Sequence, residues 1–182
     1  MFGRSSTNLV VIHVCDEGKK KTQDFKCDRG LLLEYMKYFE KYLADQKSLD
    51  DIDISVHCDI NIFEWLMNYV HSRNPVLDVK LAVSILISSD FLQMDPLVHQ
   101  TTLFIAQNLQ EIINLPIDMS CINSTLVQKL ADCVDILILD GLEDKKDKLR
   151  SKLYMKKLEL VFSDPKSILQ RCVQCSQLYT KK

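Results

Sequence analysis

The chain has 182 residues, of which 47% are apolar, and a formal net charge of -2. This composition is enough for a globular core, and the near-neutral charge gives no general attraction to nucleic-acid phosphates or acidic membranes. No run reaches the roughly 18 apolar residues of a membrane span, and the first residues lack a secretory signal pattern. The seven cysteines form no small disulfide-scaffold pattern and are typical of reduced thiols in the cytosol or nucleus.

The N-terminal third is predicted to hold a small sheet and one helix. Leu9–Cys15 and Thr22–Cys27 are short β-branched or alternating runs around a lysine-rich turn, which predicts a hairpin. The spacing of apolar residues predicts a helix over about Asp28–Asp45, and Asp51–Cys58 alternates like a third strand.

Helices are predicted to follow. Asp59 is a suitable N-cap for a helix that ends near Val70, and Val79 begins a second helix with a continuous apolar face. Asp95 and Pro96 restart the chain as a third helix that runs to Leu109, since Pro fits the first helical position. A small sheet capping a helical cluster is the simplest α+β arrangement for this order.

The remaining chain is predicted to be helical as well. A short helix covers Glu111–Leu115, a longer one covers Asn123–Asp140 with Gly141 as its stop, and a charged one covers Glu143 to about Phe162. The run Lys145–Lys157 contains seven Lys or Arg residues. We interpret this run as a solvated outer face, with contact to an acidic partner or nucleic acid as the alternative.

Two segments carry a family resemblance. In FKCDRGLLLEYMKYF, residues 25–39, a strand ends in Phe, an Arg follows, and an apolar helix closes on Tyr-Phe. In SSDFLQMDPLVHQTTLFIAQNL, residues 88–109, an elbow carries Leu-Gln-Met and then Leu. Both segments resemble the BTB/POZ family, and the matching residues are Phe25, Arg29, Leu31, Leu32, Tyr38, Phe39, Leu92, Gln93, Met94 and Leu97. More narrowly, VIHVCDE (Val11–Glu17) and DISVHCDINIFEWLMNYV (Asp53–Val70) resemble the BTB domains of a group of class-switch recombination regulators.

The resemblance implies a BTB/POZ core over residues 1–115, a helical extension over 116–163 and a tail over 164–182. It also implies a homodimer formed through the first helix and the first strand. The dimer-interface residues implied in this way are Leu9, Val11, Leu31, Leu32, Tyr35, Met36 and Phe39. The chain departs from the family pattern at Asp28, where a His is usual, at Met36, where a Ser is usual, and at His71–Pro75, which replaces a strand.

The tail contains one pattern with metal-binding chemistry. Cys172 and Cys175 form a CVQC motif, in which two thiolates can bind one tetrahedral Zn²⁺ from a tight turn. The pair supplies half of a ligand set. We expect either half of a zinc module whose other half lies further along a longer chain, a metal-free tail, or a site completed by other residues or a second subunit. A thioredoxin-like redox pair is not favoured, because the motif follows a helical segment.

No catalytic constellation is present. His13 with Cys15, and His57 with Cys58, are best interpreted as strand packing, since alternation puts the second pair on opposite faces. The acidic groups Asp16–Glu17 and Asp50–Asp53 have no adjoining His and are interpreted as solvated strand ends. The four glycines, at positions 3, 18, 30 and 141, form no phosphate-binding loop. We therefore expect no enzyme activity and no cofactor other than zinc at Cys172 and Cys175.

The expected function is a non-enzymatic protein-interaction module that forms homodimers within a nuclear regulator of transcription or DNA recombination. Corepressor-type partners, the nucleus, and the cytoplasm as a second location are implied by the family resemblance. Membrane association and direct nucleic-acid binding find no support in the sequence. Two alternatives are an adaptor that docks a cullin-type ubiquitin ligase through the helix near Phe63–Val70, and a zinc-dependent nucleic-acid-binding domain that uses CVQC and the basic helix.

Overall fold

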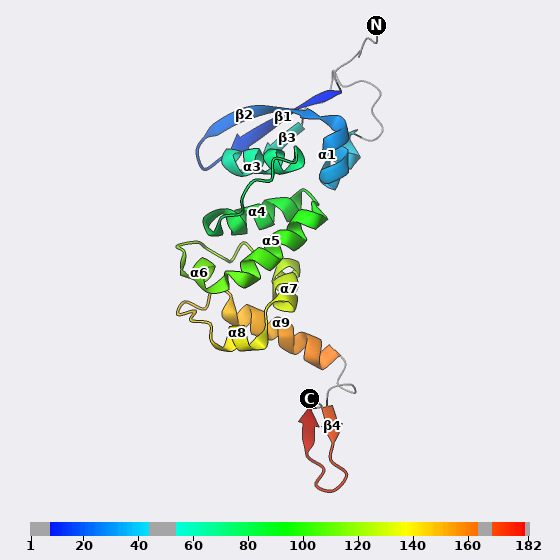
Figure 1. The fold of residues 1–182 in the computed structure, drawn as a ribbon, viewed down its shortest axis with the longest axis vertical. Helices are drawn as coiled ribbons and strands as arrows, with labels where there is room; N and C mark the ends of the chain where they lie inside the picture. Colours follow the sequence, from blue (N-terminus) through cyan, green and yellow to red (C-terminus); the bar gives the residue numbers. More distant parts are fainter. Residues whose placement is uncertain (1–7, 44–53, 164–168, 181–182) are drawn as a thin grey trace. The chain divides into compact units, whose positions relative to one another are not determined.

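The computed structural model describes residues 8–43, 54–163 and 169–180 (Figure 1). The chain divides by its internal contacts into two units, with the boundary between Phe104 and Ile105. The expected division at residue 115 stays a prediction. No helix in the part that the structure describes is both long enough and apolar enough to cross a bilayer.

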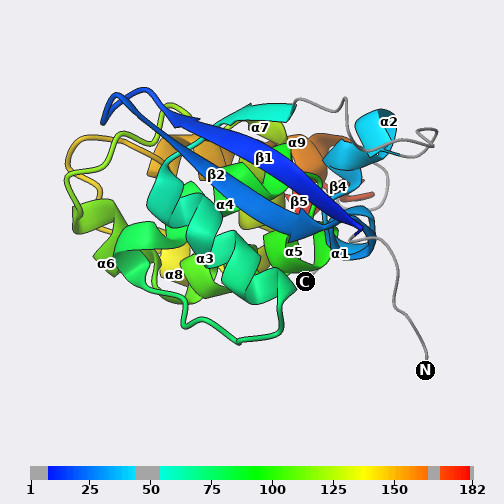
Figure 2. The same ribbon diagram turned by 90° about the horizontal axis from the view of Figure 1, so that it is seen from above.

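The first unit begins with a three-stranded sheet in the order β2-β1-β3 (Figure 2). β1 (Leu9–Asp16) pairs with β2 (Lys21–Asp28) in antiparallel fashion and with β3 (Ile54–His57) in parallel. Successive side chains of a strand face opposite sides, so Val10, Ile12 and Val14 are buried while their neighbours lie on the other face. The three predicted strands are confirmed within the described residues; residues 51–53 lie outside them.

The helix predicted over Asp28–Asp45 is interrupted, which corrects the sequence-based expectation. α1 (Arg29–Tyr35) ends at Met36, whose φ of -125° and ψ of 83° are not helical. A 3₁₀ turn over Lys37–Phe39 then leads into the single turn of α2 (Glu40–Leu43). The apolar periodicity continues through this break because the segments before and after it bury their side chains in one core. These side chains are Leu32, Met36, Phe39 and Leu43. The Arg29 side chain donates to the carbonyl of Leu43 and joins the two ends.

The helices that follow match the prediction. α3 (Ile60–Val70) begins at Asp59, whose carboxylate accepts hydrogen bonds from the N–H groups of Asn61 and Ile62. α3 lies against the sheet, and α4 (Val79–Phe91) and α5 (Asp95–Gln107) continue the chain (Figure 1). In the described segment 71–78 no strand forms, and the left-handed residues Ser72 and Asn74 turn the chain instead.

In its described residues the second unit contains helices α6 to α9, and several of them differ from expectation. α6 (Leu109–Asn114) is followed by α7 (Ser124–Cys133) and α8 (Ile136–Asp140) where one helix was predicted. Val134 is extended, and Asp135 starts α8 as a new N-cap because its carboxylate accepts the N–H of Leu137. The side chains of Leu137 and Ile138, which one continuous helix would place on its apolar face, are 77% and 52% exposed.

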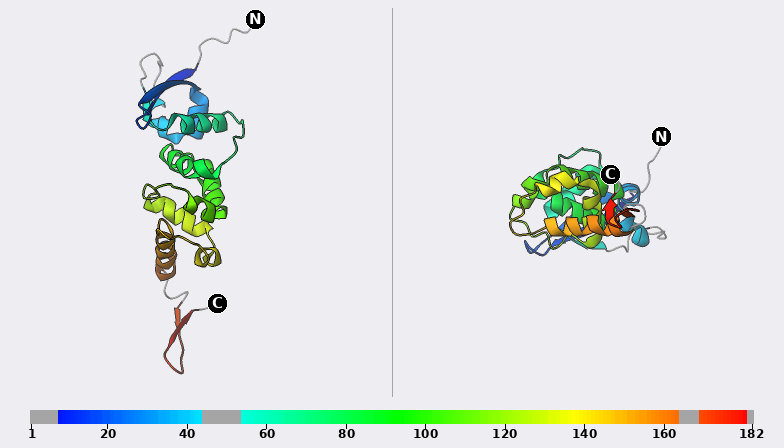
Figure 3. Two further views of the ribbon diagram at one scale, coloured as in Figure 1. Left: turned by 90° about the vertical axis from the view of Figure 1, so that its left-hand side faces the viewer. Right: turned by 90° about the horizontal axis from the view of Figure 1, so that it is seen from below.

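α9 (Arg150–Ser163) also starts later than the predicted Glu143. Residues 143–149 form a loop in which the Asp144 carboxylate accepts the N–H groups of Lys148, Leu149 and Arg150. α9 packs against α7; in Figure 3 they are orange and yellow-green. The chain then forms an antiparallel hairpin of β4 (Leu169–Arg171) and β5 (Leu178–Thr180), which the sequence-based assignment did not include.

Candidate protein-interaction surface

An aromatic groove of about 360 Å³ lies on the surface of the first unit. It is formed by the end of α1, the exposed side of α3, and the elbow that leads into α5. The lining residues are Glu34, Tyr35, Lys37, Tyr69, Gln93, Met94, Asp95, Pro96 and Leu97. Met94 and Leu97 are also core residues, so the floor of the groove belongs to the packed interior. We call this set of nine residues the α1–α3 groove.

The aromatic side chains of the groove are held in place by one another. The Tyr35 and Tyr69 rings meet edge to face with centroids 6.3 Å apart, and the Trp65 ring stacks on Tyr69 at 6.1 Å. The Trp65 indole N–H donates to the carbonyl of Val76 at 3.1 Å. Rigid aromatic groups with a polar handle are the side chains that most often anchor protein contacts.

A charged pair marks the edge of the groove. The Lys37 ammonium lies 2.8 Å from the Asp95 carboxylate, and both side chains are exposed. This hydrogen bond, together with the charge of Asp95, raises the pKa of Lys37. An exposed pair contributes little stability. The Lys37–Asp95 pair instead holds one positive and one negative charge in fixed positions beside the apolar floor of the groove.

The residues implied as the dimer interface fall into two groups. Leu32, Met36 and Phe39 are wholly buried in the core of the single chain. Leu9 is 43% exposed, and Val11, Leu31 and Tyr35 are half-buried on the surface. The dimer interface stays a prediction. Of the residues implied, only Leu9, Val11, Leu31 and Tyr35 are accessible to a partner in the single chain.

The accessible group comes from two elements, with Leu9 and Val11 on the central strand β1 and the other two residues on α1. Leu9 opens β1 next to α1, since Asn8 accepts a hydrogen bond from the N–H of Arg29 at 2.8 Å. Leu31 lies in the first turn of α1, and Tyr35 ends that helix at the α1–α3 groove. We call Leu9, Val11, Leu31 and Tyr35 the α1 edge.

The sequence analysis did not identify a second aromatic cluster, which is centred on Phe91 and Tyr38. Phe91 is 52% exposed, and its ring centroid lies 4.7 Å from that of Tyr38. The Tyr42 hydroxyl lies 3.5 Å from that of Tyr38, and the Lys41 ammonium lies over both tyrosine rings. The sequence did contain one signal that could have predicted the α1–α3 groove. Trp65 and Tyr69 are four residues apart in α3, beside its buried face, so their side chains are neighbours on the helix surface.

The candidate metal and acid–base residues of the sheet have ordinary structural roles. His13 bonds to Asp24 at 2.6 Å and His57 lies 3.0 Å from Glu17 on the outer face, while the Cys58 sulfur contacts the hydroxyl of Ser88. Among residues 8–43, 54–163 and 169–180, no group of three or more His, Cys, Asp or Glu side chains is placed to hold a metal.

Asp16 was predicted to be a solvated strand end, and this was wrong, because its side chain is buried. Its carboxylate accepts the backbone N–H groups of Lys19 and Ile60 and so joins the β1–β2 turn to the start of α3. The Lys19 N–H hydrogen bond in particular lowers the pKa of Asp16. Asp50, Asp51 and Asp53 lie outside the described residues.

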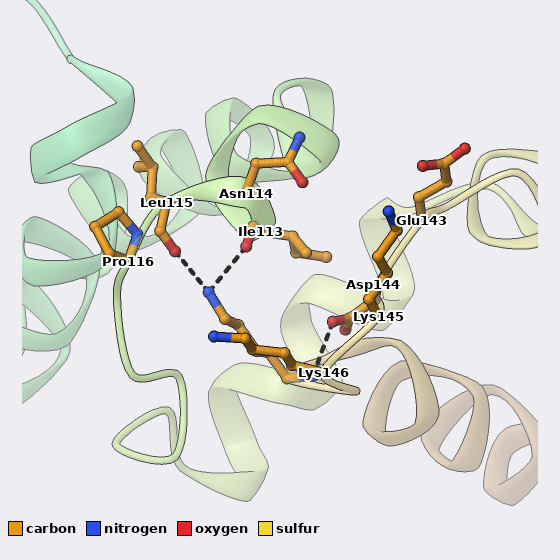
Figure 4. Close-up of a pocket in the computed structure, with 9 residues that line it drawn as sticks. Ile113, Asn114, Leu115, Pro116, Glu143, Asp144, Lys145 and Lys146 are labelled. Carbon is orange, nitrogen blue, oxygen red and sulfur yellow. Dashed lines mark hydrogen bonds between the residues drawn. The ribbon is translucent and has the colours of Figure 1, made fainter.

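The basic run of the second unit borders a pocket of about 300 Å³ (Figure 4). The Lys148 ammonium donates hydrogen bonds to the carbonyl oxygens of Ile113 and Leu115, at 2.9 and 2.5 Å. Figure 4 marks the bonds to these two carbonyls with dashed lines. Lys148 therefore caps the C-terminal end of α6, where a positive charge is favourable. Lys145 and Lys146 are exposed at the rim, as expected for a solvated face.

Cys172 and Cys175 lie in the loop of the β4–β5 hairpin, with Cys172 half-buried and Cys175 exposed. A strand rather than a helix precedes the motif, which corrects the sequence-based premise. A strand also follows it, so the thioredoxin-like arrangement, in which a helix follows, is absent from these residues. Backbone N–H groups of Cys175 and Gln174 donate to the Cys172 sulfur and lower the pKa of its thiol.

The three-stranded sheet, the helices α1 to α5 and the appended helices are the elements of a BTB/POZ protein, and the expected α+β fold class is confirmed. The model of the family "SANT and BTB domain regulator of CSR, BTB domain" matches residues 10–102, just over half of the chain. The chain belongs to this family.

Among solved structures, the chain is similar to the BTB domain of zebrafish PATZ1, with 16% sequence identity and a TM-score of 0.44. The superposition covers 54% of this chain and 75% of the zebrafish chain. As a BTB domain, the chain contains a protein–protein interaction module.

Proposed function

We propose that this chain is a non-enzymatic homodimerisation module of a nuclear regulator of transcription or DNA recombination. The observation that carries the proposal is the α1 edge, where four apolar side chains remain accessible on rigid elements next to an aromatic groove. A two-fold axis lets such a patch contact its own copy, so one surface is sufficient for a closed dimer.

Dimerisation would act by doubling the number of binding modules in one assembly. A second binding event then becomes intramolecular, and overall affinity can rise by orders of magnitude without a new type of contact. The family name supports a regulatory role. The nuclear location and corepressor-type partners are part of the proposal. The α1–α3 groove, with its fixed tyrosines and its Lys37–Asp95 pair, is the surface we assign to such a partner.

The test is solution mass by light scattering over a wide range of protein concentration, in metal-free buffer. We expect a dimer for the wild-type chain and a monomer for Leu9→Asp and Leu31→Asp, because each places a charge in an apolar interface. Leu81→Asp is the matched control, since Leu81 is 38% exposed on α4 and lies outside the α1 edge. A wild-type monomer at every concentration would overturn the proposal.

A pull-down with a cullin N-terminal domain separates this function from that of a ubiquitin-ligase adaptor. Stoichiometric binding that is lost on substitution of the exposed α3 residue Glu64 or the half-buried Asn68 would favour the adaptor. Absence of binding by a folded dimer would agree with the proposed function.

A further inference from the structure

Cys172 and Cys175 both lie in the loop of the β4–β5 hairpin. The strands pair from Leu169–Thr180 to Arg171–Leu178, and the Cys172 N–H donates to the Gln177 carbonyl at 2.8 Å. The Ser176 N–H donates to the Cys172 carbonyl at 2.9 Å, a bond that spans four residues and makes one helix-like turn. Residues three apart in such a turn lie on the same side, which brings Cys172 and Cys175 to one face.

The loop holds this arrangement through its backbone. The Cys172 N–H bond to Gln177 and the Ser176 N–H bond to Cys172 fix the backbone on both sides of the motif. Ser176 has a left-handed backbone, with φ of 59°, and this conformation turns the chain out of the loop toward β5. Local hydrogen bonds therefore hold the backbone that carries the two thiols.

The described side chains of the hairpin give its two strands little apolar support. Over residues 170–177 and at Tyr179 every side chain is half-buried or exposed, and Val173 is 99% exposed. An isolated two-stranded hairpin is marginally stable in water. A metal ion bound at the loop supplies folding free energy, and small modules without a core commonly depend on one.

We propose that Cys172 and Cys175 form a thiolate half-site for Zn²⁺ that is completed by the same two cysteines of a second copy of the chain. Zinc in structural sites takes four ligands in a tetrahedron, and four cysteine thiolates are a common set. The described residues of one chain provide no third ligand near this pair. The loop is exposed, so two hairpins can meet at a two-fold axis and share one ion, with the four thiols releasing their protons on binding.

The inference does not depend on dimerisation through the α1 edge, because the hairpin and that edge belong to different units. Zinc would act as a second, metal-dependent link between copies. A chain with a charged α1 edge should therefore still pair when zinc is added.

The test is a titration of the reduced 182-residue chain with Co²⁺, followed by displacement with Zn²⁺, in the presence of a phosphine reductant. We expect thiolate-to-cobalt absorption in the near ultraviolet that saturates at one ion per two chains, because a tetrathiolate site needs both hairpins. Cys172→Ser and Cys175→Ser should each abolish the absorption. Cys121→Ser, which removes another exposed thiol of the same unit, should leave it unchanged.

Light scattering in the Leu31→Asp background separates this inference from the proposed function. Zinc-dependent doubling of the mass in Leu31→Asp, lost when Cys175→Ser is added, supports the shared site whether or not the metal-free wild-type chain is a dimer. Three results would overturn the shared site: no metal binding by the reduced chain, binding that survives Cys175→Ser, or saturation at one ion per chain without any change in mass. The last result would assign the remaining ligands to the same chain.

Discussion

The Asp28 carboxylate accepts a hydrogen bond from the backbone N–H of Leu31 at 3.1 Å, which makes Asp28 the N-cap of α1. BTB relatives commonly carry a His at this position, so the departure from the pattern has a local structural role. Capping satisfies one of the amide groups that have no partner in the first turn of a helix. The same helix carries Leu31 and Tyr35 of the α1 edge, so the cap also positions the proposed dimer surface.

Removal of this cap should lower stability. Asp28→Ala is expected to reduce the free energy of unfolding by about 1 kcal/mol, since a first-turn amide loses its acceptor. For a chain of this size, this corresponds to a fall of roughly 2–4 °C in Tm. Asp28→Asn keeps the acceptor oxygen and should unfold close to the wild-type temperature; equal losses for both variants would show that the cap is not the cause. Thermal unfolding followed by circular dichroism measures the difference.

The core of the first unit should depend strongly on Phe63. Its ring is wholly buried and meets Phe25 edge to face with centroids 4.9 Å apart. Phe63→Ala should destabilise the chain by about 3–5 kcal/mol, because it removes apolar contacts and leaves a cavity. Phe91→Ala truncates a half-exposed ring and should cost much less. Urea denaturation of the two variants gives the comparison, and similar costs would contradict the assignment of Phe91 to the surface.

Acid should weaken the junction between the β1–β2 turn and α3. The Lys19 N–H hydrogen bond holds the pKa of Asp16 below its ordinary value. The carboxylate therefore contributes stability above its unfolded pKa, and this contribution is lost as the pH falls through the lower folded pKa. The difference in free energy of unfolding between wild type and Asp16→Asn should be largest near neutral pH and shrink in acid. Urea denaturation at a series of pH values tests this, with Asp132→Asn as the control for net charge.

The thiol of Cys27 should be unreactive in the folded chain. It is wholly buried, and burial raises its pKa to about 11. Because the thiolate is the reactive form, alkylation at mildly alkaline pH should modify the exposed Cys121 and Cys175 well before Cys27. Mass spectrometry of digested samples over time measures the order, and unfolding in urea should remove the difference. Early modification of Cys27 in the native chain would contradict its placement in the core.

Lys148 should be worth more to stability than its neighbours in the basic run. Its ammonium donates to the carbonyls of Ile113 and Leu115, so Lys148→Ala leaves two partly buried acceptors without this donor. We expect a loss of about 1–3 kcal/mol. Lys145→Ala and Lys146→Ala remove the same charge from exposed positions and should change stability by less than about 0.5 kcal/mol. Denaturant unfolding of the three variants decides whether position rather than charge matters.

Patterns along the chain were sufficient for the elements whose cause is local. Alternation in LVVIHVC predicted β1, Asp59 predicted the start of α3, and Asn123 predicted the start of α7, where its side chain accepts the Leu126 N–H at 2.8 Å. The motifs at Phe25–Phe39 and around Leu92–Met94 identified the family. These features follow from backbone geometry, capping and the burial of one face, which act over a few residues.

Apolar periodicity does not by itself locate breaks or surfaces. Leu32, Met36 and Phe39 repeat like one helix, yet the chain bends at Met36 because these side chains reach one core from two directions. Leu137 and Ile138 continue the apolar pattern of α7, but Asp135 restarts the helix and turns them outward. The α1–α3 groove likewise combines residues from three separate stretches.

The sequence by itself determined the α+β class, the BTB family and the cysteine pair, since each depends on residue types at short spacing. Tertiary packing alone decided which apolar residues of the first helix face the core and which remain on the α1 edge. The physical reason is that a helix face is buried or exposed according to what packs against it. Capping and alternation, by contrast, involve only neighbouring residues along the chain.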